Sequence, residues 1–387
     1  MRTDPAGGYH SWVRRPEILV TQSPGRTTVL VDRLQWVRFD AAGRWNAALM
    51  GGRTYRRALS GRVLSILTEG AEGNRFHEVD EVRADAIPLV EQTVRDWAAA
   101  GLGVPAQPVG VVRDADASAR RALHRAAHLD LALDASAFRA AYRGNPIVPP
   151  DRAQDVLLQS TVGCAHNGCT FCEFYDKTRY TVRTPKRFAE HLAAVRDCLG
   201  DALPWRRGVF LGDANPLSAK ADIIIDHLRQ VREAWGEVLT LPSEHLPQHP
   251  WHAPSNAVRV FCDAFLTPRQ TDEELREMAR LGLHRVYLGV ETGCDALLEF
   301  LRKPASSAAA LHLVERLHAA GIHVSVLLMV GVGGDLYAQR HFEDTVALVQ
   351  RMRLDPSDAV VFSEFFELAG SAYVTRAREQ GIEALSR

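Results

Sequence analysis

Three cysteines stand close together in the segment TVGCAHNGCTFCEFY, residues 161–175. Cys164, Cys169 and Cys172 have the spacing C-x4-C-x2-C and make up half of the 6 cysteines in the chain. Thiolates grouped in this way bind zinc or iron–sulfur clusters. An iron–sulfur cluster held by three cysteines would leave one iron without a protein ligand, open to another molecule. The spacing therefore favours a metal centre with one free coordination position.

Two other metal centres are compatible with these residues. A structural zinc ion takes four ligands, and His166 would have to be the fourth although it stands only two residues after Cys164. The same spacing with a distant fourth cysteine is typical of plant-type [2Fe–2S] ferredoxins, and Cys198 could be that ligand. Cys198, however, lies in RFAEHLAAVRDCLG, an amphipathic helical pattern in which a buried thiol is an ordinary apolar residue. This alternative would make the protein an electron-transfer or sensing protein.

Six apolar runs in the C-terminal part of the chain have the pattern of buried strands. Their polar alternation is weak, as expected for parallel strands that are covered on both faces. The runs are residues 156–161, 208–213, 258–265, 285–291, 324–331 and 359–365. Helical patterns separate them, so that strand and helix alternate. This order predicts parallel pairing with right-handed crossovers.

Several residues indicate where the helices between these strands begin and end. Thr184 followed by Pro185 is typical of a helix start, and TDEE at 271–274 is a capping box. Ser218 is a third candidate cap, and Gly282 and Gly321 suit helix ends in the left-handed conformation. A complete eight-unit barrel takes about 250 residues with each unit visible. The six units in residues 151–387 therefore predict an α/β fold, an open (βα)6 partial TIM barrel.

Residues 1–150 have a different pattern and are expected to form an additional N-terminal α+β domain. TVLVDRLQWVRFD, AAG and RWNAALMGG together predict an antiparallel hairpin with a glycine-containing turn. Two helical patterns follow, at about 83–100 and 115–143, and GNPIVPP at 144–150 has the composition of a linker. The domain boundary is therefore placed between residues 150 and 151.

Composition and charge are those of an ordinary globular protein. Apolar residues make up 46% and charged residues 24% of the chain, with a formal net charge of −1. This balance gives no indication of nucleic acid as a partner. No apolar run approaches the roughly 20 residues needed to span a bilayer, and the N-terminal segment lacks the apolar stretch of a signal peptide. We expect a cytoplasmic protein without a membrane partner.

The cysteine loop, placed directly after the first strand of an open barrel, resembles that of the radical S-adenosylmethionine (SAM) enzymes. The loop is one residue longer than the commoner C-x3-C-x2-C and is similar to that of a minority of members. Phe171 matches the aromatic residue before the third cysteine. FLGDANPL, LGVETGCDALLEFLRKP and GIHVSVLLMVGVGGD also resemble family segments at the ends of strands 2, 4 and 5. The resemblance extends over about residues 155–370.

The resemblance implies a site and a set of cofactors. Cys164, Cys169 and Cys172 would hold a [4Fe–4S] cluster whose free iron binds SAM. The resemblance places SAM against residues from four segments, with the amino group at strand 2, the methionyl or ribose part at strand 4 and the adenine at strand 5. These residues are Phe171, Gly212, Asp213, Glu291, Val330 and Gly331.

The implied reaction is the reductive cleavage of SAM to methionine and a 5′-deoxyadenosyl radical, which takes a hydrogen atom from a substrate. The electron would come from an external donor of the flavodoxin or ferredoxin type. The sequence has neither a second cysteine group nor a D-x-H-x-x-G cobalamin motif in residues 1–150. We therefore expect oxidation, rearrangement or elimination on a small molecule, with residues 1–150 serving as a specificity domain or lid.

Overall fold

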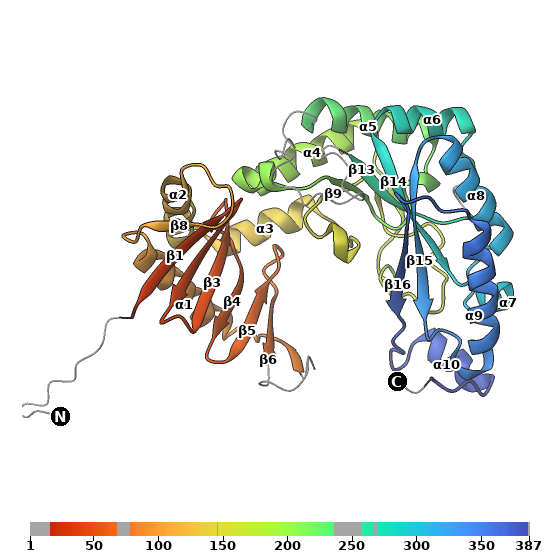
Figure 1. The fold of residues 1–387 in the computed structure, drawn as a ribbon, viewed down its shortest axis with the longest axis horizontal. Coiled ribbons are helices and arrows are strands. Elements are labelled where there is room, and N and C mark those ends of the chain that lie inside the picture. The colour runs from red at the N-terminus through yellow and green to blue at the C-terminus, as the bar shows by residue number, and fades with distance from the viewer. Residues whose placement is uncertain (1–15, 68–77, 145, 236–256, 266–268, 386–387) are drawn as a thin grey trace, which may run out of the picture. The chain divides into compact units, whose positions relative to one another are not determined.

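The computed structural model describes residues 16–67, 78–144, 146–235, 257–265 and 269–385 (Figure 1). The chain forms two compact units, Met1–Phe138 and Arg139–Arg387, each of which is described by itself. The sequence placed the boundary twelve residues further on, at 150/151. The separate role of an N-terminal domain stays a prediction.

The N-terminal unit is built on an eight-stranded sheet. Seven consecutive strands pair antiparallel, and the eighth, β8, joins β1 in parallel. In sheet order the strands are β7 (Glu78–Glu81), β6 (Val63–Leu67), β5 (Arg53–Arg57), β4 (Trp45–Met50), β3 (Gln35–Asp40), β2 (Arg26–Val31), β1 (Ile18–Ser23) and β8 (Ala106–Pro108). Helices α1 (Ile87–Gly101) and α2 (Ala115–His128) pack on one face, where Val94 and Leu123 join Val29, Val37 and Phe39 in the core.

Two details of this unit differ from the sequence prediction. Residues 28–40 are not one strand, because Asp32 and Arg33 have φ of 51° and 58° and reverse the chain between β2 and β3. The helical pattern 115–143 is divided into α2 and α3 (Leu131–Ala141). Asp130 starts the second helix, since its carboxylate accepts hydrogen bonds from the backbone N–H groups of Ala132 and Leu133.

The C-terminal unit contains a six-stranded parallel sheet, which confirms the predicted partial TIM barrel. In sheet order the strands are β16 (Ala359–Glu364), β15 (His323–Val330), β14 (Leu283–Glu291), β13 (Val258–Cys262), β12 (Val209–Gly212) and β9 (Val156–Gln159). A short antiparallel pair, β10 (Thr161–Val162) with β11 (Thr181–Val182), follows β9 and encloses the cysteine loop. The six predicted apolar runs are therefore strands.

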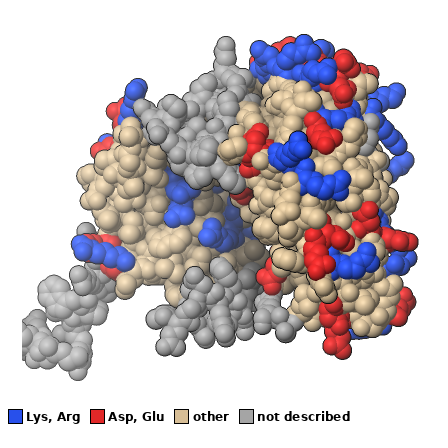
Figure 2. Space-filling view, turned by 45° about the vertical axis from the view of Figure 1, so that its right-hand side comes forward, with Lys and Arg blue, Asp and Glu red and all other residues tan. Residues whose placement is uncertain are grey.

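Helices cover the outer side of this sheet (Figure 1). They are α4 (Pro185–Leu199), α5 (Ala221–Trp235), α6 (Asp272–Arg280), α7 (Asp295–Phe300), α8 (Ser307–Ala319) and α9 (Gly334–Arg351), with short 3₁₀ turns at Pro150–Arg152, Gly200–Trp205 and Pro216–Ser218. Helix α10 (Ala372–Glu379) lies beyond the carboxyl ends of β15 and β16 and packs against α7 (Figure 1). Acidic and basic side chains are interspersed over this unit (Figure 2). Among the described residues no helix is both long and apolar enough to cross a membrane.

The predicted helix signals hold with one exception. Thr184 accepts a hydrogen bond from the N–H of Arg187 at the start of α4, and Thr271 forms the capping box of α6. Gly282 and Gly321 have φ of 108° and 77° after α6 and α8. Ser218 was wrong as a cap. It ends a 3₁₀ turn, where its hydroxyl donates to the carbonyl of Asn215, and α5 begins three residues later.

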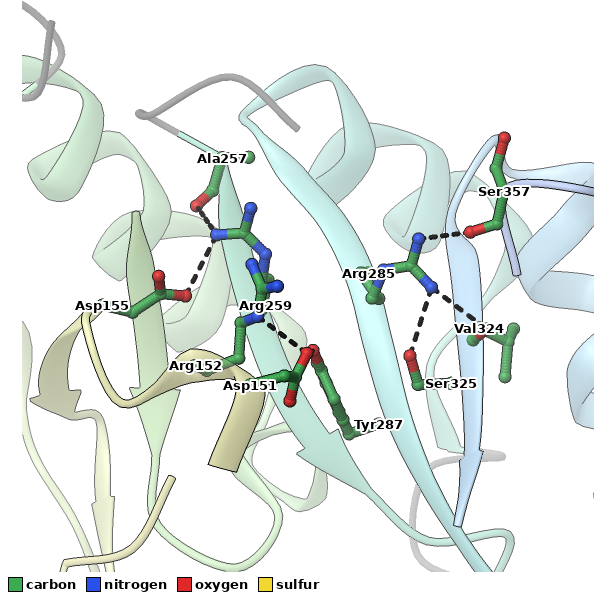
Figure 3. A network of polar contacts seen from close by, with 10 residues as sticks. All are labelled: Asp151, Arg152, Asp155, Ala257, Arg259, Arg285, Tyr287, Val324, Ser325 and Ser357. Atoms are coloured by element: carbon green, nitrogen blue, oxygen red, sulfur yellow. Dashed lines mark hydrogen bonds and ion pairs between the residues drawn. The ribbon is translucent and has the colours of Figure 1, made fainter. Parts of the chain in front are cut away.

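The interior of the barrel, below the carboxyl ends of its strands, is filled by side chains from neighbouring strands. Phe210, Phe261 and Tyr287 form an aromatic layer with ring centroids 4.8–6.1 Å apart. Toward the amino ends of the strands, the guanidinium of Arg259 lies 3.1 Å from the carboxylate of Asp155 (Figure 3). These two side chains are 2% and 1% exposed, so this end of the barrel is packed and is no channel.

Candidate functional site

The predicted site residues come from the carboxyl ends of neighbouring parallel strands. The cysteine loop follows β9 and β10, Asp213 follows β12, and Glu291 and Val330 end β14 and β15. These ends meet at one edge of the sheet, which is where enzymes of barrel folds hold their substrates. The structure therefore brings the predicted segments to the same end of the barrel.

The cysteine loop is fixed by hydrogen bonds to two distant segments. The backbone N–H of Thr170 donates to the carbonyl of Leu301 at 3.0 Å, and its carbonyl accepts from the N–H of Tyr373 at 3.0 Å. Nε2 of His166 lies 2.9 Å from the carbonyl of Arg302. His166 thus binds the turn after α7 rather than a metal, which removes the fourth ligand of the zinc alternative.

The spacing of the three thiols also argues against a single ion. Two sulfurs bound to one zinc ion at about 2.3 Å each cannot be more than about 4.6 Å apart. The three cysteine sulfurs do not all lie within 4.8 Å of one another, whereas potential ligand atoms of His318, Asp355 and Asp358 elsewhere in the described chain do. Their wider separation suits a polynuclear cluster.

The loop also offers polar atoms that lack a partner inside the protein. Thr170 Oγ1 and the Tyr175 hydroxyl are buried and have no hydrogen-bond partner in the described part of the chain. Burial raises the pKa of the Cys169 thiol to about 12, although the nearby Lys303 ammonium acts in the opposite direction. A bound metal would replace the proton on this thiol. Thiols of this spacing with unsatisfied hydroxyls beside them fit an iron–sulfur cluster.

Cys198 does not join the three loop cysteines. It is 6% exposed and lies in the last turn of α4, whose first residue, Pro185, follows directly on β11. A helix rises about 1.5 Å per residue, which places Cys198 about 20 Å along α4 from its first turn. The ferredoxin alternative therefore lacks its fourth ligand in this structure.

Asp213 is fully buried at the base of the cysteine loop. Its carboxylate accepts the backbone N–H of Gly163 at 3.0 Å and the side-chain amide of Gln159 at 3.1 Å. Burial raises the pKa of Asp213 to about 6, and these hydrogen bonds partly offset the effect. The side chain thus holds the residue directly before Cys164. The predicted contact with an amino group of SAM stays a prediction.

Glu291 forms a buried ion pair that the sequence did not predict. Its Oε1 lies 2.7 Å from Nζ of Lys303, and the two side chains are 13% and 6% exposed. Burial alone would lower the pKa of Lys303, but the carboxylate of Glu291 outweighs it and the pKa is raised. Glu291 has φ of 64° and follows directly on a shift in the register of β14 with β15, which lies between Gly289 and Glu291.

Gly289 leaves the space for this ion pair. A Cβ on Gly289 would stand 2.9 Å from Oε1 of Glu291 and 3.0 Å from Nζ of Lys303. Such contacts are closer than normal van der Waals separations, so a larger residue would displace one of the two groups. The present geometry of the pair therefore depends on the small size of this residue.

Two further polar residues at this strand edge escaped the sequence analysis. The side-chain amide of Asn215 donates to Asp263 at 2.7 Å, and Asp263 is 9% exposed. Lys303 is the third missed residue, and the field of Asp263 also raises its pKa. Asp263 could have been found as an acidic residue within an apolar run that ends at the same edge as Glu291.

The remaining predicted contacts differ in accessibility. Phe171 packs against a core cluster that includes Tyr373 and Cys294, so its ring is used in packing. Val330 is 50% exposed, and nothing lies within 4 Å of a Cβ built on Gly331. The backbone at Val330–Gly331 is therefore open to a ligand. Cys294 is fully buried.

A cavity of about 300 Å³ lies outside the barrel interior, between helices α5 and α6 and the amino ends of strands β12, β13 and β14. It contains none of the predicted site residues. Trp235 and Ala257 on its wall adjoin residues 236–256, which lie outside the described part of the chain.

Comparison with known proteins gives one family and several structures. The sequence pattern of the radical SAM superfamily matches residues 158–349. No curated protein matches the chain. The radical SAM methyltransferase TsrM from Kitasatospora setae, solved with cobalamin and a [4Fe–4S] cluster, is 16% identical, with a TM-score of 0.42 over 62% of this chain and 44% of its own. Coproporphyrinogen III oxidase (HemN) from Escherichia coli, a radical SAM enzyme, is 13% identical, with a TM-score of 0.41 over 66% and 52%. The chain thus spans about half the length of these proteins or less.

Proposed function

Residues 158–349 belong to the radical SAM superfamily, and from this premise we propose that the enzyme abstracts hydrogen from a small-molecule substrate by means of a 5′-deoxyadenosyl radical. Its cofactors are a [4Fe–4S] cluster and SAM. The observation that carries the proposal is the set of three cysteines at the carboxyl edge of an open barrel. Oxidation, rearrangement and elimination are the reaction types proposed.

Cys164, Cys169 and Cys172 would hold the cluster. SAM would lie along the strand edge, with Gly212 and Asp213 near its amino group, Glu291 near its methionyl or ribose part, and the Val330–Gly331 backbone beside adenine. When bound, the cluster supplies the electron that cleaves the sulfonium of SAM into methionine and the radical. The electron itself must come from an external donor.

The protein's own residues position these groups and keep the site dry. Asp213 holds the N–H of Gly163 and so fixes the chain at the entry to the cysteine loop. The aromatic layer of Phe210, Phe261 and Tyr287 closes the barrel below the strand edge. Lys303 places a buried positive charge near Cys169 and Cys172, where the thiolates would add negative charge. Such charges influence the reduction potential of a cluster.

The remaining three cysteines give no indication of a second iron–sulfur cluster, and this agrees with a small-molecule substrate. Cys198, Cys262 and Cys294 are buried and belong to α4, β13 and the segment before α7. Among the described residues, they form no group of three potential metal ligands. The N-terminal unit is proposed to act as a specificity domain or lid for this substrate.

The test is anaerobic reconstitution with iron and sulfide, followed by dithionite and SAM. We expect the electron paramagnetic resonance signal of a reduced [4Fe–4S] cluster, a change of that signal on addition of SAM, and 5′-deoxyadenosine detected by mass spectrometry. Cys169→Ala should lose the cluster, whereas Cys198→Ala, a matched thiol removal, should keep it. A [2Fe–2S] centre that disappears in Cys198→Ala and ignores SAM would contradict the proposal.

A further inference from the structure

The sheet of the N-terminal unit has a second face that its hydrophobic core does not use. Val29, Val37 and Phe39 point toward α1 and α2. Because side chains alternate along a strand, the residues between them, such as Leu30 and Arg38, point to the opposite side. The residue types on this opposite face are therefore not explained by packing against α1 and α2.

Three arginines gather on this opposite face, and we call Arg26, Arg38 and Arg56 together the arginine face. In the strand register Arg38 is opposite Ala47, and Ala47 is opposite Arg56. The two arginines are thus two strand spacings apart, about 10 Å between Cα atoms. Ala47 between them is fully buried, so its methyl group leaves room for both guanidinium groups to converge above it. Arg26 is opposite Asp40, two residues along β3 from Arg38.

Arg38 and Arg56 have no ion-pair partner among the described residues, whereas exposed arginines elsewhere, such as Arg33 and Arg62, pair with glutamates. Nε of Arg38 is buried and makes no hydrogen bond within the described ranges. Burial, and then the charges of Arg26 and Arg56, lower the pKa of Arg38. Like charges held together with an unsatisfied donor are costly unless an anion joins them.

An apolar strip lies directly beside the arginines. Leu30, Trp36 and Leu49 are opposite one another on β2, β3 and β4. Trp36 is two residues before Arg38 on β3, so both side chains point to the same face. The guanidinium of Arg38 lies 5.0 Å from the Trp36 ring centroid. The three apolar side chains are only partly buried. The face therefore offers cationic donors directly beside an apolar aromatic surface, because Arg38 and Trp36 are two residues apart on the same strand and their side chains are in contact.

We propose that the arginine face binds a small molecule in which a carboxylate or phosphate group is joined to an apolar ring system. Guanidinium groups donate paired hydrogen bonds that match the planar oxygens of a carboxylate and the oxygens of a phosphate. The ring system would lie on Trp36, Leu30 and Leu49. This site is separate from the cysteine loop, and its test requires neither cluster nor SAM, so it stands or falls independently of the proposed radical reaction.

The extent of the positive charge favours a small anion over a polymer. Residues that are opposite one another on neighbouring strands form a row across the sheet. The row through Arg38 and Arg56 continues to Leu64 and ends at the exposed Glu81. A nucleic acid or an acidic peptide lying along this row would find no further unpaired positive charge beyond Arg56, because Leu64 is apolar and Glu81 is paired with Arg62. Trp36 is also the one aromatic residue in the apolar strip as defined here, whereas single-stranded nucleic acids stack on a series of aromatic rings.

The experiment is isothermal titration calorimetry of the full-length protein with three naphthalene probes. 1-Naphthyl phosphate and 1-naphthylacetate carry the two anionic groups, and 2-(1-naphthyl)ethanol is the neutral control. We expect saturable binding of at least one anion, at least tenfold tighter than the neutral probe and weaker in high salt. Binding of only one anion assigns the group that the site prefers.

Variants test whether the arginines carry this binding. Arg38→Met and Arg56→Met should each weaken anion binding about tenfold or more, because each removes charged hydrogen bonds. Arg33→Met, which removes an exposed arginine outside the face, should stay within about twofold. Arg56 is exposed, so its variant should keep the circular dichroism spectrum and melting temperature of the wild type even if Arg38→Met does not.

Three results would overturn the proposal. The first is equal binding of the neutral and anionic probes, or saturable binding of none of them. The second is wild-type affinity in both Arg38→Met and Arg56→Met. The third is tighter binding of a thymidine oligonucleotide or of polyglutamate than of either naphthyl anion, since this would make the face a polymer surface.

Discussion

Lys303→Met is the substitution that most directly probes the buried ion pair beside the cysteine loop. Methionine has a similar length but no charge. The change removes the partner of Glu291, whose side chain is 13% exposed and whose Oε1 accepts the Lys303 ammonium at 2.7 Å. The carboxylate would then remain in the same apolar setting without its cation.

The size of the effect follows from the burial of both groups. Removing one partner of a buried ion pair costs about 3–5 kcal/mol, because the other charge stays buried and uncompensated. An exposed pair is worth about 0–1 kcal/mol. Since Lys303 is 6% exposed, we place this pair in the buried class. Replacing both members, as in Lys303→Met with Glu291→Leu, should recover most of the lost stability.

Urea unfolding of the cluster-free protein, followed by circular dichroism, measures these differences without interference from metal. Lys303→Met should lower the unfolding midpoint strongly, the double variant should restore it, and Arg33→Met, from an exposed pair with Glu17, should leave it unchanged. A loss below 1 kcal/mol for Lys303→Met, or an equal loss in the double variant, would refute the argument from burial.

Three further outcomes follow from the fold and the site. Asp155→Ala should lower the free energy of unfolding of the C-terminal unit by about 3–5 kcal/mol, measured by urea unfolding, because Arg259 stays buried without its carboxylate. If Asp155→Ala causes no further loss of stability in an Arg259→Met background, the pairing is confirmed. Gly289→Ala should lower the cluster content after reconstitution by forcing Glu291 and Lys303 apart, and an unchanged iron content would count against that reasoning. The pKa of His191 is lowered to about 3, chiefly by burial, so the unfolded chain binds a proton below about pH 6.5 that the folded chain does not. His191 alone should therefore lower the stability by about 1.4 kcal/mol per pH unit between pH 6.5 and about 3, and His191→Gln should show a shallower pH dependence; an identical slope in both proteins would disprove it.

The barrel could be predicted because its strands are continuous apolar runs. Val209–Gly212 and most of His323–Val330 are covered on both faces, so burial leaves an apolar pattern that needs no knowledge of distant contacts. The cysteine trio was equally accessible, since its three members are close in the chain. The capping box at Thr271 was found for the same reason.

The parts that were missed depend on contacts between distant residues or on turns without glycine. Lys303 meets Glu291 only because the chain returns to the strand edge after α7. The hydrogen bonds of Asp213 to Gly163 and Gln159 were not predicted, because they depend on the pairing of β9 with β12; its contact with a ligand stays a prediction. The strand β5, RTYRR, was not predicted because its arginines obscure the apolar alternation.

The ladder between β10 and β11 has a consequence for the order of assembly. Thr161 is opposite Val182 and Val162 is opposite Thr181, so the ladder that joins the two ends of the cysteine-bearing segment uses no metal ligand. Closing a loop of this length costs conformational entropy, and here protein hydrogen bonds have already met that cost. Iron and sulfide could therefore enter a chain that has finished folding, and loading after purification should need no denaturation step.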